Sequence, residues 1–149
     1  MQMNDSQRIP ASKAKVWAAL NDPDVLRRCI PGCQSLEMAS PTEMIATVVL
    51  KVGPVKATFS GKVTLTDIDA PNGYRIVGEG AGGVAGFAKG GAKVRLEEET
   101  PGVTILHYEA EAQIGGKLAQ LGSRLIDSTS RKLAANFFES FAAVVAPSS

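Results

Sequence analysis

The stretch Gly116–Val145, GKLAQLGSRLIDSTSRKLAANFFESFAAVV, decides the fold. It contains no proline, and its apolar side chains recur at three- and four-residue steps, the spacing of one face of an α-helix. The apolar stripe consists of Leu118, Leu121, Leu125, Leu133, Phe137 and Val144. The opposite, solvated face consists of Gln120, Arg124, Asp127, Arg131 and Glu139. The pattern predicts one amphipathic helix about 42 Å long at 1.5 Å per residue, which needs a large apolar surface to lie across.

The region before this helix, from Gln34 to Gly115, changes to a period of two. It is clearest over residues 55–66, where one face carries Val55, Ala57, Phe59, Val63 and Leu65. Turn signals cut the region at Ser40-Pro41, Gly53-Pro54, Pro71-Asn72-Gly73, Gly82-Gly83 and Pro101-Gly102. Alternation between short turns is typical of antiparallel strands with one buried face. We therefore expect about six strands in a meander.

The N-terminal segment adds a strand and two short helices. Residues 1–9 alternate weakly and predict a first strand, and residues 12–20 predict a short helix. Asp22-Pro23 is a helix start, with an N-cap acid followed by proline at the first helical position, and Pro31-Gly32 ends that second helix. The parts predict an α+β fold over residues 1–146: a curved antiparallel sheet of about seven strands around a long C-terminal helix. Residues 147–149 are expected to form a disordered tail.

Small side chains mark the expected inner face of the sheet. They are Gly78, Gly80, Gly90, Ala92, Ala110 and Ala112. One interpretation is that they let the helix pack closely on the sheet, and the other is that they leave a cavity. Thr129, Asn136 and Ser140, placed on the inner side of the helix, favour the cavity because buried polar atoms are costly without water or a ligand.

Composition narrows the classes of function. The chain has 149 residues, a formal net charge of +1 and no basic run, so we expect no nucleic-acid partner. No apolar stretch is long enough to span a membrane, and the N-terminus does not resemble a secretory signal. Cys29 and Cys33 are the only cysteines, which suits a reducing compartment. We therefore expect a cytoplasmic protein.

Candidate chemical groups are few. His107 alternates onto the outer face of its strand, so we expect a surface histidine, and Cys29 and Cys33 have no second pair to complete a zinc site. No catalytic residue and no metal ligand is predicted. The glycine-rich stretch Gly80–Gly91 allows two interpretations: a hairpin whose Phe87 packs in the core, or a mobile flap over a cavity mouth.

Three segments carry a family resemblance. They are VWAALNDPDVLRRCIPGC (16–33), GFAKGGAKVRL (86–96) and IGGKLAQLGSRLIDSTSRKLAANFF (114–138). They resemble the CoxG family of carbon monoxide dehydrogenase subunits, within the START-like (SRPBCC) helix-grip superfamily that includes the birch-pollen allergen and polyketide cyclases. The resemblance implies a sheet that grips a long helix over a hydrophobic cavity.

The resemblance also implies a role. Such a protein would be a non-catalytic accessory of a molybdenum-containing, carbon monoxide dehydrogenase-type hydroxylase, at the inner face of the cytoplasmic membrane, and would link that enzyme to the quinone pool. Its partners would be the hydroxylase subunits, a lipophilic small molecule and, transiently, a membrane surface. Some relatives carry a membrane segment after the domain. The present sequence stops at Ser149, so we expect no anchor of that kind.

A ligand site follows from these expectations. No intrinsic cofactor is expected, and menaquinone or ubiquinone is the expected ligand. The expected cavity residues are Trp17, Leu26, Ile30, Phe59, Tyr74, Phe87, Tyr108, Ala110, Ala112, Leu118, Leu121, Leu125, Thr129 and Asn136. Two alternatives remain open. One is a polyketide cyclase-like enzyme in which Tyr108, Thr129 and Asn136 orient a substrate, and the other is an assembly or membrane-recruitment factor without a small-molecule ligand.

Overall fold

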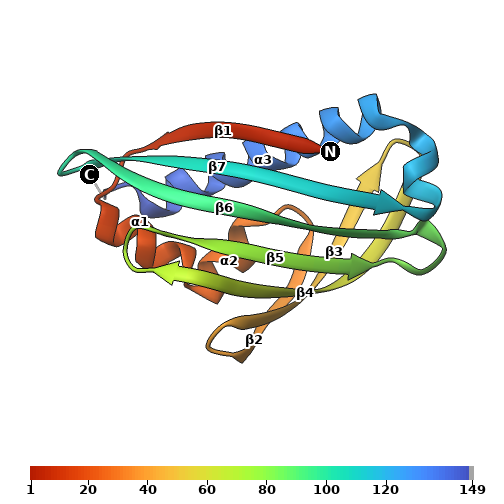
Figure 1. Ribbon diagram of the computed structural model, residues 1–149, viewed down its shortest axis with the longest axis horizontal. Coiled ribbons are helices and arrows are strands. Elements are labelled where there is room, and N and C mark those ends of the chain that lie inside the picture. The colour runs from red at the N-terminus through yellow and green to blue at the C-terminus, as the bar shows by residue number, and fades with distance from the viewer. Residues whose placement is uncertain (148–149) are drawn as a thin grey trace.

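One curved, seven-stranded antiparallel sheet forms most of the protein, and a C-terminal helix crosses its concave side (Figure 1). The computed structural model describes residues 1–147. The strands are β1 (Gln2–Ile9), β2 (Cys33–Ser40), β3 (Glu43–Val52), β4 (Val55–Asp69), β5 (Gly73–Ala81), β6 (Phe87–Thr100) and β7 (Val103–Gly115). Their order is β1-β7-β6-β5-β4-β3-β2. Both the strand number and the meander expected from the alternation are confirmed.

Two short helices follow β1 and lie together at one end of the sheet (Figure 1). Helix α1 (Lys13–Leu20) is capped by Ser12, whose hydroxyl accepts a hydrogen bond from the Lys15 backbone N–H. Helix α2 (Pro23–Cys29) is capped by Asp22 and begins with proline. Both starts agree with the local sequence signals, because a cap side chain satisfies backbone N–H groups that the first helical turn leaves unpaired.

The C-terminal helix is shorter than predicted. Residues Gly116–Leu121 form a separate 3₁₀ helix, η2, and the α-helix α3 runs over Ser123–Val145, 23 residues. Between them Gly122 adopts φ 92° and ψ 152°, a conformation that only glycine adopts readily. The expectation of one helix over Gly116–Val145 was therefore wrong: α3 spans about 35 Å at 1.5 Å per residue.

The core divides into two clusters along the long axis of the molecule. The larger one lies at the α1–α2 end, and its fully buried side chains include Ile9, Val16, Leu106, Phe141 and Val145. There the hydroxyl of Thr104, itself fully buried, donates to the Ala11 carbonyl at 2.8 Å. The smaller one, at the opposite end, is built on four buried residues. These are Val52, Phe59, Ala85 and Leu118.

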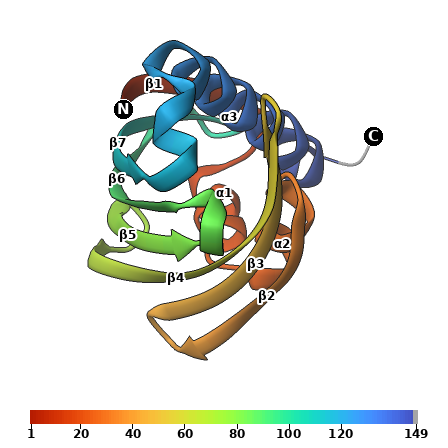
Figure 2. The same cartoon turned by 90° about the vertical axis from the view of Figure 1, so that its right-hand side faces the viewer.

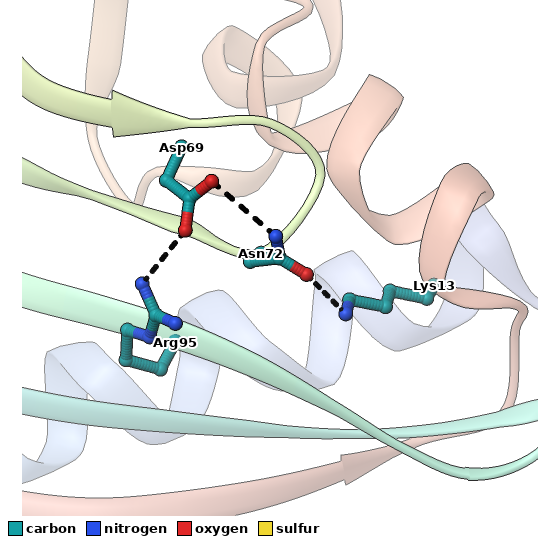
Figure 3. A network of polar contacts seen from close by, with 4 residues as sticks. All are labelled: Lys13, Asp69, Asn72 and Arg95. Atoms are coloured by element: carbon teal, nitrogen blue, oxygen red, sulfur yellow. Dashed lines mark hydrogen bonds and ion pairs between the residues drawn. The ribbon is translucent and has the colours of Figure 1, made fainter.

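A polar network joins α1 to the β4–β5 turn and to β6 (Figure 3). The ammonium of Lys13 donates to the Asn72 side-chain oxygen, and Asn72 Nδ2 donates to Asp69 at 3.4 Å. Arg95 on β6 reaches the other Asp69 oxygen, also at 3.4 Å. Arg95 and Asp69 are half-exposed, so their ion pair adds little stability. The network mainly holds the β4–β5 turn beside α1.

The predicted tail at 147–149 falls, apart from Pro147, outside the described residues. A helix with the length and hydropathy needed to cross a bilayer does not occur in residues 1–147.

Candidate ligand-binding cavity

A cavity of about 590 Å³ lies between α3 and the concave face of the sheet, partly open to solvent. Its volume falls within the ~300–1,000 Å³ of small-molecule sites. The sheet contributes small or aliphatic residues, among them Ala46, Val48, Leu50, Gly61, Val63, Ile76, Gly80, Ala88, Ala92, Ala110 and Ile114. The helix contributes Ile126, Thr129, Ser130, Leu133, Ala134, Phe137 and Phe138. The cavity reaches from Leu26 on α2 to Leu118 on η2, so it spans both core clusters.

Small residues on the central strands create this space. Helix α3 packs against α1 and α2 and against strands β1 and β3, while β4, β5 and β6 face it across the cavity. Gly80, Ala92 and Ala110 line that gap. The cavity interpretation therefore holds for these positions.

Gly90 has another reason to be small. A Cβ atom at this position would lie 2.0 Å from the Glu111 carbonyl oxygen and 2.8 Å from the Ala112 Cα. No side chain fits there, because backbone atoms cannot yield in the way that the end of a flexible side chain can. The glycine permits close approach of β6 and β7.

Four hydroxyl groups are the polar features of the walls: Tyr74, Tyr108, Thr129 and Ser130. The Tyr74 hydroxyl lies 3.5 Å from the Leu20 carbonyl, at the limit of a hydrogen bond. Within residues 1–147, no protein hydrogen bond involves the hydroxyls of Tyr108, Thr129 or Ser130. No charged side chain of the described residues lines the cavity. The walls therefore suit a neutral, mainly apolar molecule with a few hydrogen-bonding atoms.

Both tyrosines stay protonated at neutral pH. Burial raises the pKa of Tyr74 to about 12. Burial also raises the pKa of Tyr108; the negative charge of Asp5 adds to the increase, and Arg131 opposes it. Desolvation disfavours the charged phenolate, so each hydroxyl keeps its proton. That of Tyr74 is directed at the Leu20 carbonyl, and that of Tyr108 can donate to an acceptor in the cavity.

Aromatic rings form the walls nearest the α1–α2 end. Tyr108 stacks on Phe138 with ring centroids 5.4 Å apart, and Phe137 meets Phe138 edge to face at 5.1 Å. Trp17 lies behind Tyr74 at 5.3 Å. Such rings offer flat apolar surfaces, and Trp17 is one ring removed from the cavity.

The structure brings eight of the predicted site residues to the cavity wall. They are Leu26, Ile30, Phe59, Tyr74, Tyr108, Ala110, Leu118 and Thr129. Their contact with a ligand remains a prediction. Six other predicted residues do not line the cavity.

Three of these six belong to the C-terminal segment. The exposed residue Asn136 lies about 100° around the helix from Phe137, outside the arc that faces the sheet. Leu125 packs on Gly53, where a Cβ would approach its Cδ2 to 2.8 Å. Leu121 joins the smaller core cluster. The apolar stripe was misplaced because the prediction assumed one continuous helix from Leu118 onward. Gly122 separates η2 from α3, so side chains before and after it do not share one helical face.

The other three lie outside the cavity wall for separate reasons. Trp17 is separated from the cavity by Tyr74. Phe87 is 50% exposed, and its ring covers Gly115, where a Cβ would come within 2.2 Å of it. Neither the hairpin with Phe87 in the core nor a position on the cavity wall is therefore correct. Ala112 is half-buried and paired with Gly90; it does not line the cavity, although Ala110 and Ile114 on either side of it along β7 do.

Sequence reasoning missed the whole β3 wall. Met44, Ala46, Val48, Leu50 and Val52 line the cavity and follow a period of two. The signal was masked because Ile45 and Val49, on the outer face of the same strand, are also apolar.

The histidine and the two cysteines lie outside the cavity. His107 is 47% exposed on the outer face, 3.8 Å from Glu97, which confirms the surface position predicted for it. Cys29 is buried, Cys33 is half-buried, and both are free thiols. Burial raises the pKa of both thiols, which reduces the reactive thiolate at neutral pH.

Solved structures show the same fold. A conserved protein from Geobacillus kaustophilus is 29% identical, with a TM-score of 0.92 over 97% of this chain and 95% of that one. A START superfamily protein from Mycobacterium smegmatis is 10% identical, with a TM-score of 0.74 over 97% and 96%. The Zhui aromatase/cyclase from Streptomyces sp. R1128 is 10% identical, with a TM-score of 0.67 over 97% and 93%. The last two likenesses concern the fold alone, which is START-like.

Sequence comparison gives the family. No protein of curated function matches the chain. The profile of CoxG, a family of carbon monoxide dehydrogenase subunits, matches residues 6–146, nearly the whole length that folds around the cavity. The protein therefore belongs to the CoxG family.

Proposed function

We propose that this protein binds a quinone, menaquinone or ubiquinone, in the cavity under α3. In this role it is a non-catalytic accessory of a molybdenum-containing, carbon monoxide dehydrogenase-type hydroxylase in the cytoplasm and links that enzyme to membrane quinones. The observation that carries the proposal is the 590 Å³ cavity with apolar walls and four hydroxyl groups. The family membership supports the choice of partner.

The distribution of polar groups favours a quinone over an ionised lipid. A quinone head is flat and apolar except at two carbonyl oxygens, which accept hydrogen bonds. Tyr108, Thr129 and Ser130 supply donors on two facing elements, β7 and α3. A carboxylate or phosphate would be buried here without a cation, which is costly. An isoprenoid tail would occupy the aliphatic part between β3 and α3.

The same walls favour binding over catalysis. Proton transfer is most efficient for a group whose pKa lies near the working pH. The ionisable residues of the wall are Tyr74 and Tyr108, and the pKa of each is raised away from neutrality. The polyketide cyclase-like alternative makes a distinct prediction, namely that a bound molecule is recovered chemically changed.

A fluorescence titration tests quinone binding. A ubiquinone or menaquinone analogue with one isoprene unit should quench Trp17 through Tyr74 and saturate at one ligand per chain. Ala134→Leu, on the wall, should weaken binding about tenfold, or about 1.4 kcal/mol, because it fills the space. Ala135→Leu, the exposed neighbour on α3, is the matched control and should leave affinity unchanged. Quenching no stronger than that of free tryptophan would disprove quinone binding.

A second experiment tests the partner. The quinone-loaded protein is mixed with a purified carbon monoxide dehydrogenase-type hydroxylase and carbon monoxide, and quinone reduction is followed by absorbance. Reduction should be faster than with free quinone at equal concentration. Equal rates would reject the accessory role while leaving ligand binding intact.

A further inference from the structure

The cavity is partly open to solvent, although side chains close its two ends. Leu26 on α2 lies at one end and Leu118 on η2 at the other, and both are buried. Seen along the molecule, α3 lies between β1 and β3 and covers the open side of the curved sheet (Figure 2). The opening is therefore to be sought along the two sides of α3, beside β1 or beside β3.

The side of α3 that runs along β3 is closed. The inward-facing residues of β3 line the cavity, and each of them is buried or half-buried. They are Met44, Ala46, Val48, Leu50 and Val52. Strand β2 continues the sheet beyond β3, and α2 packs on it. No exposed side chain interrupts the wall on this side.

The side that runs along β1 differs at one residue. Met3, Asp5, Gln7 and Ile9 lie on the inner face of β1, in register with the inward-facing residues of β7. Ile9 is buried and Met3 and Gln7 are half-buried, but Asp5 between them is exposed. A carboxylate on the inner face of a sheet stays in water only where nothing covers it. Helix α3 therefore leaves β1 uncovered at this point.

The residue of α3 on the other side of this gap is Arg131. Phe138 stacks on Tyr108 with ring centroids 5.4 Å apart, and Arg131, also exposed, precedes Phe138 by about two helical turns on the same side of α3. Asp5 is in register with the same Tyr108. Burial is the main cause of the raised pKa of Tyr108; the charge of Asp5 adds to it and that of Arg131 opposes it. Both charges therefore lie near this hydroxyl, one on each side of the gap.

The two charges do not close the gap. Within residues 1–147, neither Asp5 nor Arg131 belongs to an ion pair, and the Asp5 carboxylate accepts a hydrogen bond from the Ser6 backbone N–H at 2.8 Å. Directly behind them are the rings of Tyr108 and Phe138, which line the cavity. The gap thus leads from solvent, between two opposite charges, to the cavity wall.

We propose that molecules enter and leave the cavity between β1 and α3, through a portal whose rim is Asp5 and Arg131 and whose inner surface is Tyr108 and Phe138. Attraction across the rim keeps the portal narrow without sealing it. The proposal deepens the proposed function and rests on it only in that the cavity takes an apolar molecule. Its test therefore uses Nile red, a flat neutral dye that fluoresces in apolar surroundings. Ala134→Leu, which fills the cavity, should weaken dye binding and so locates the dye.

Charge exchange, followed by stopped-flow fluorescence of the dye, tests the rim. Asp5→Arg and Arg131→Asp each place like charges across the gap, so each should speed association and dissociation about three- to fivefold, the scale of one surface charge pair. The double variant, Asp5→Arg with Arg131→Asp, should restore the original rates. Lys132→Asp makes an equal change at the adjacent exposed position, about 100° around the helix, and should alter neither rate. All differences should vanish at about 1 M salt, because salt screens the charges.

A bulky label gives a steric test of the same portal. Asp5→Cys is labelled with a large maleimide in a Cys33→Ser background, in which the remaining native thiol, Cys29, is buried. The label should slow association and dissociation about tenfold each and leave the dissociation constant nearly unchanged, because the dye must pass it in both directions. Asn4→Cys with the same label is the matched control. Asn4 is exposed on the outer face of β1, so its label should leave both rates unchanged.

The outcomes separate the portal from the ligand. Single charge variants that behave like Lys132→Asp, a double variant that does not restore the rates, or equal rates for the two labelled variants would overturn the portal. A quinone analogue that fails to bind while Nile red exchange follows the rim charges would reject the proposed function and leave the portal in place. Failure of both molecules to bind would reject both proposals.

Discussion

Single side chains set the size and polarity of the cavity. Ala92 and Ala110 face one another across β6 and β7, where larger residues would fill the space. Tyr74 is the most buried of the polar wall residues, at 5% exposed. Its ring separates Trp17 from the cavity. One residue thus contributes both a wall and a buried hydroxyl whose ionisation is linked to folding.

The Tyr74 phenol predicts a loss of stability at high pH. Its pKa rises from 10.0 to about 12 on folding, so the unfolded chain releases the proton first as the pH increases. The ionisation of Tyr74 leaves the free energy of unfolding unchanged below pH 10. Between about pH 10 and 12 it lowers that free energy by about 2–3 kcal/mol. The free energy of unfolding, measured by urea titration at several pH values, should show this fall. Tyr74→Phe should remove that part of the pH dependence, and an unchanged profile would contradict the burial of this phenol.

At the scale of elements, the two halves of α3 do different things. The C-terminal half carries Phe141 and Val145, which are fully buried beneath α1 and β1. The N-terminal half covers the cavity with Ile126, Thr129 and Ser130, and the cavity wall continues along α3 as far as Phe138. Gly122 sets where this half begins, because it turns the chain between η2 and α3.

Replacing Gly122 therefore tests the element boundary. Gly122→Ala should destabilise the protein by about 1–3 kcal/mol, because its φ of 92° and ψ of 152° strain any residue with a Cβ. Added bulk is not the cause, since a Cβ there meets nothing within 4 Å. Gly102→Ala, also in open space and without a positive φ, is the control and should change stability by less than about 0.5 kcal/mol. Similar denaturation midpoints for the two variants would show that α3 does not begin with this turn.

At the scale of the whole molecule, the cavity lies where a continuous core would otherwise join the two clusters. The sheet curves enough to surround it, and α1 and α2 close one end (Figure 1). A ligand that fills it contacts strands, η2 and α3 together. Binding should therefore stabilise the fold as one unit.

Thermal unfolding measures this coupling. A one-isoprene ubiquinone analogue at about 100 times its dissociation constant should add about 2.7 kcal/mol to the free energy of unfolding. For a chain of this size the midpoint should rise by roughly 5–10 °C. Ala134→Leu should show a smaller rise at the same ligand concentration, and Ala135→Leu the full rise. A ligand-independent midpoint in the unsubstituted protein would contradict binding inside the cavity.

Local sequence signals determined much of this protein. The alternation in residues 55–66 assigned the faces of β4 correctly, because strand side chains alternate whatever lies around them. Ser12 and Asp22-Pro23 located the starts of α1 and α2, because caps act within a single helical turn. The turns at Gly53-Pro54 and Pro101-Gly102 were equally readable, and together these parts predicted a curved sheet with one C-terminal helix.

Only the tertiary structure decided how α3 meets the sheet. The apolar stripe from Leu118 to Val144 is compatible with one continuous helix, because glycine is tolerated within a helix and the sequence does not specify the φ of Gly122. Once Gly122 breaks that helix, Asn136 turns to solvent and Ser130 faces the cavity. Whether small residues allow close packing or leave space was decided in the same way: Gly90 meets the backbone of β7, whereas Gly80 and Ala92 face a gap. The distance between helix and sheet depends on all the side chains that hold them apart, and no local pattern encodes it.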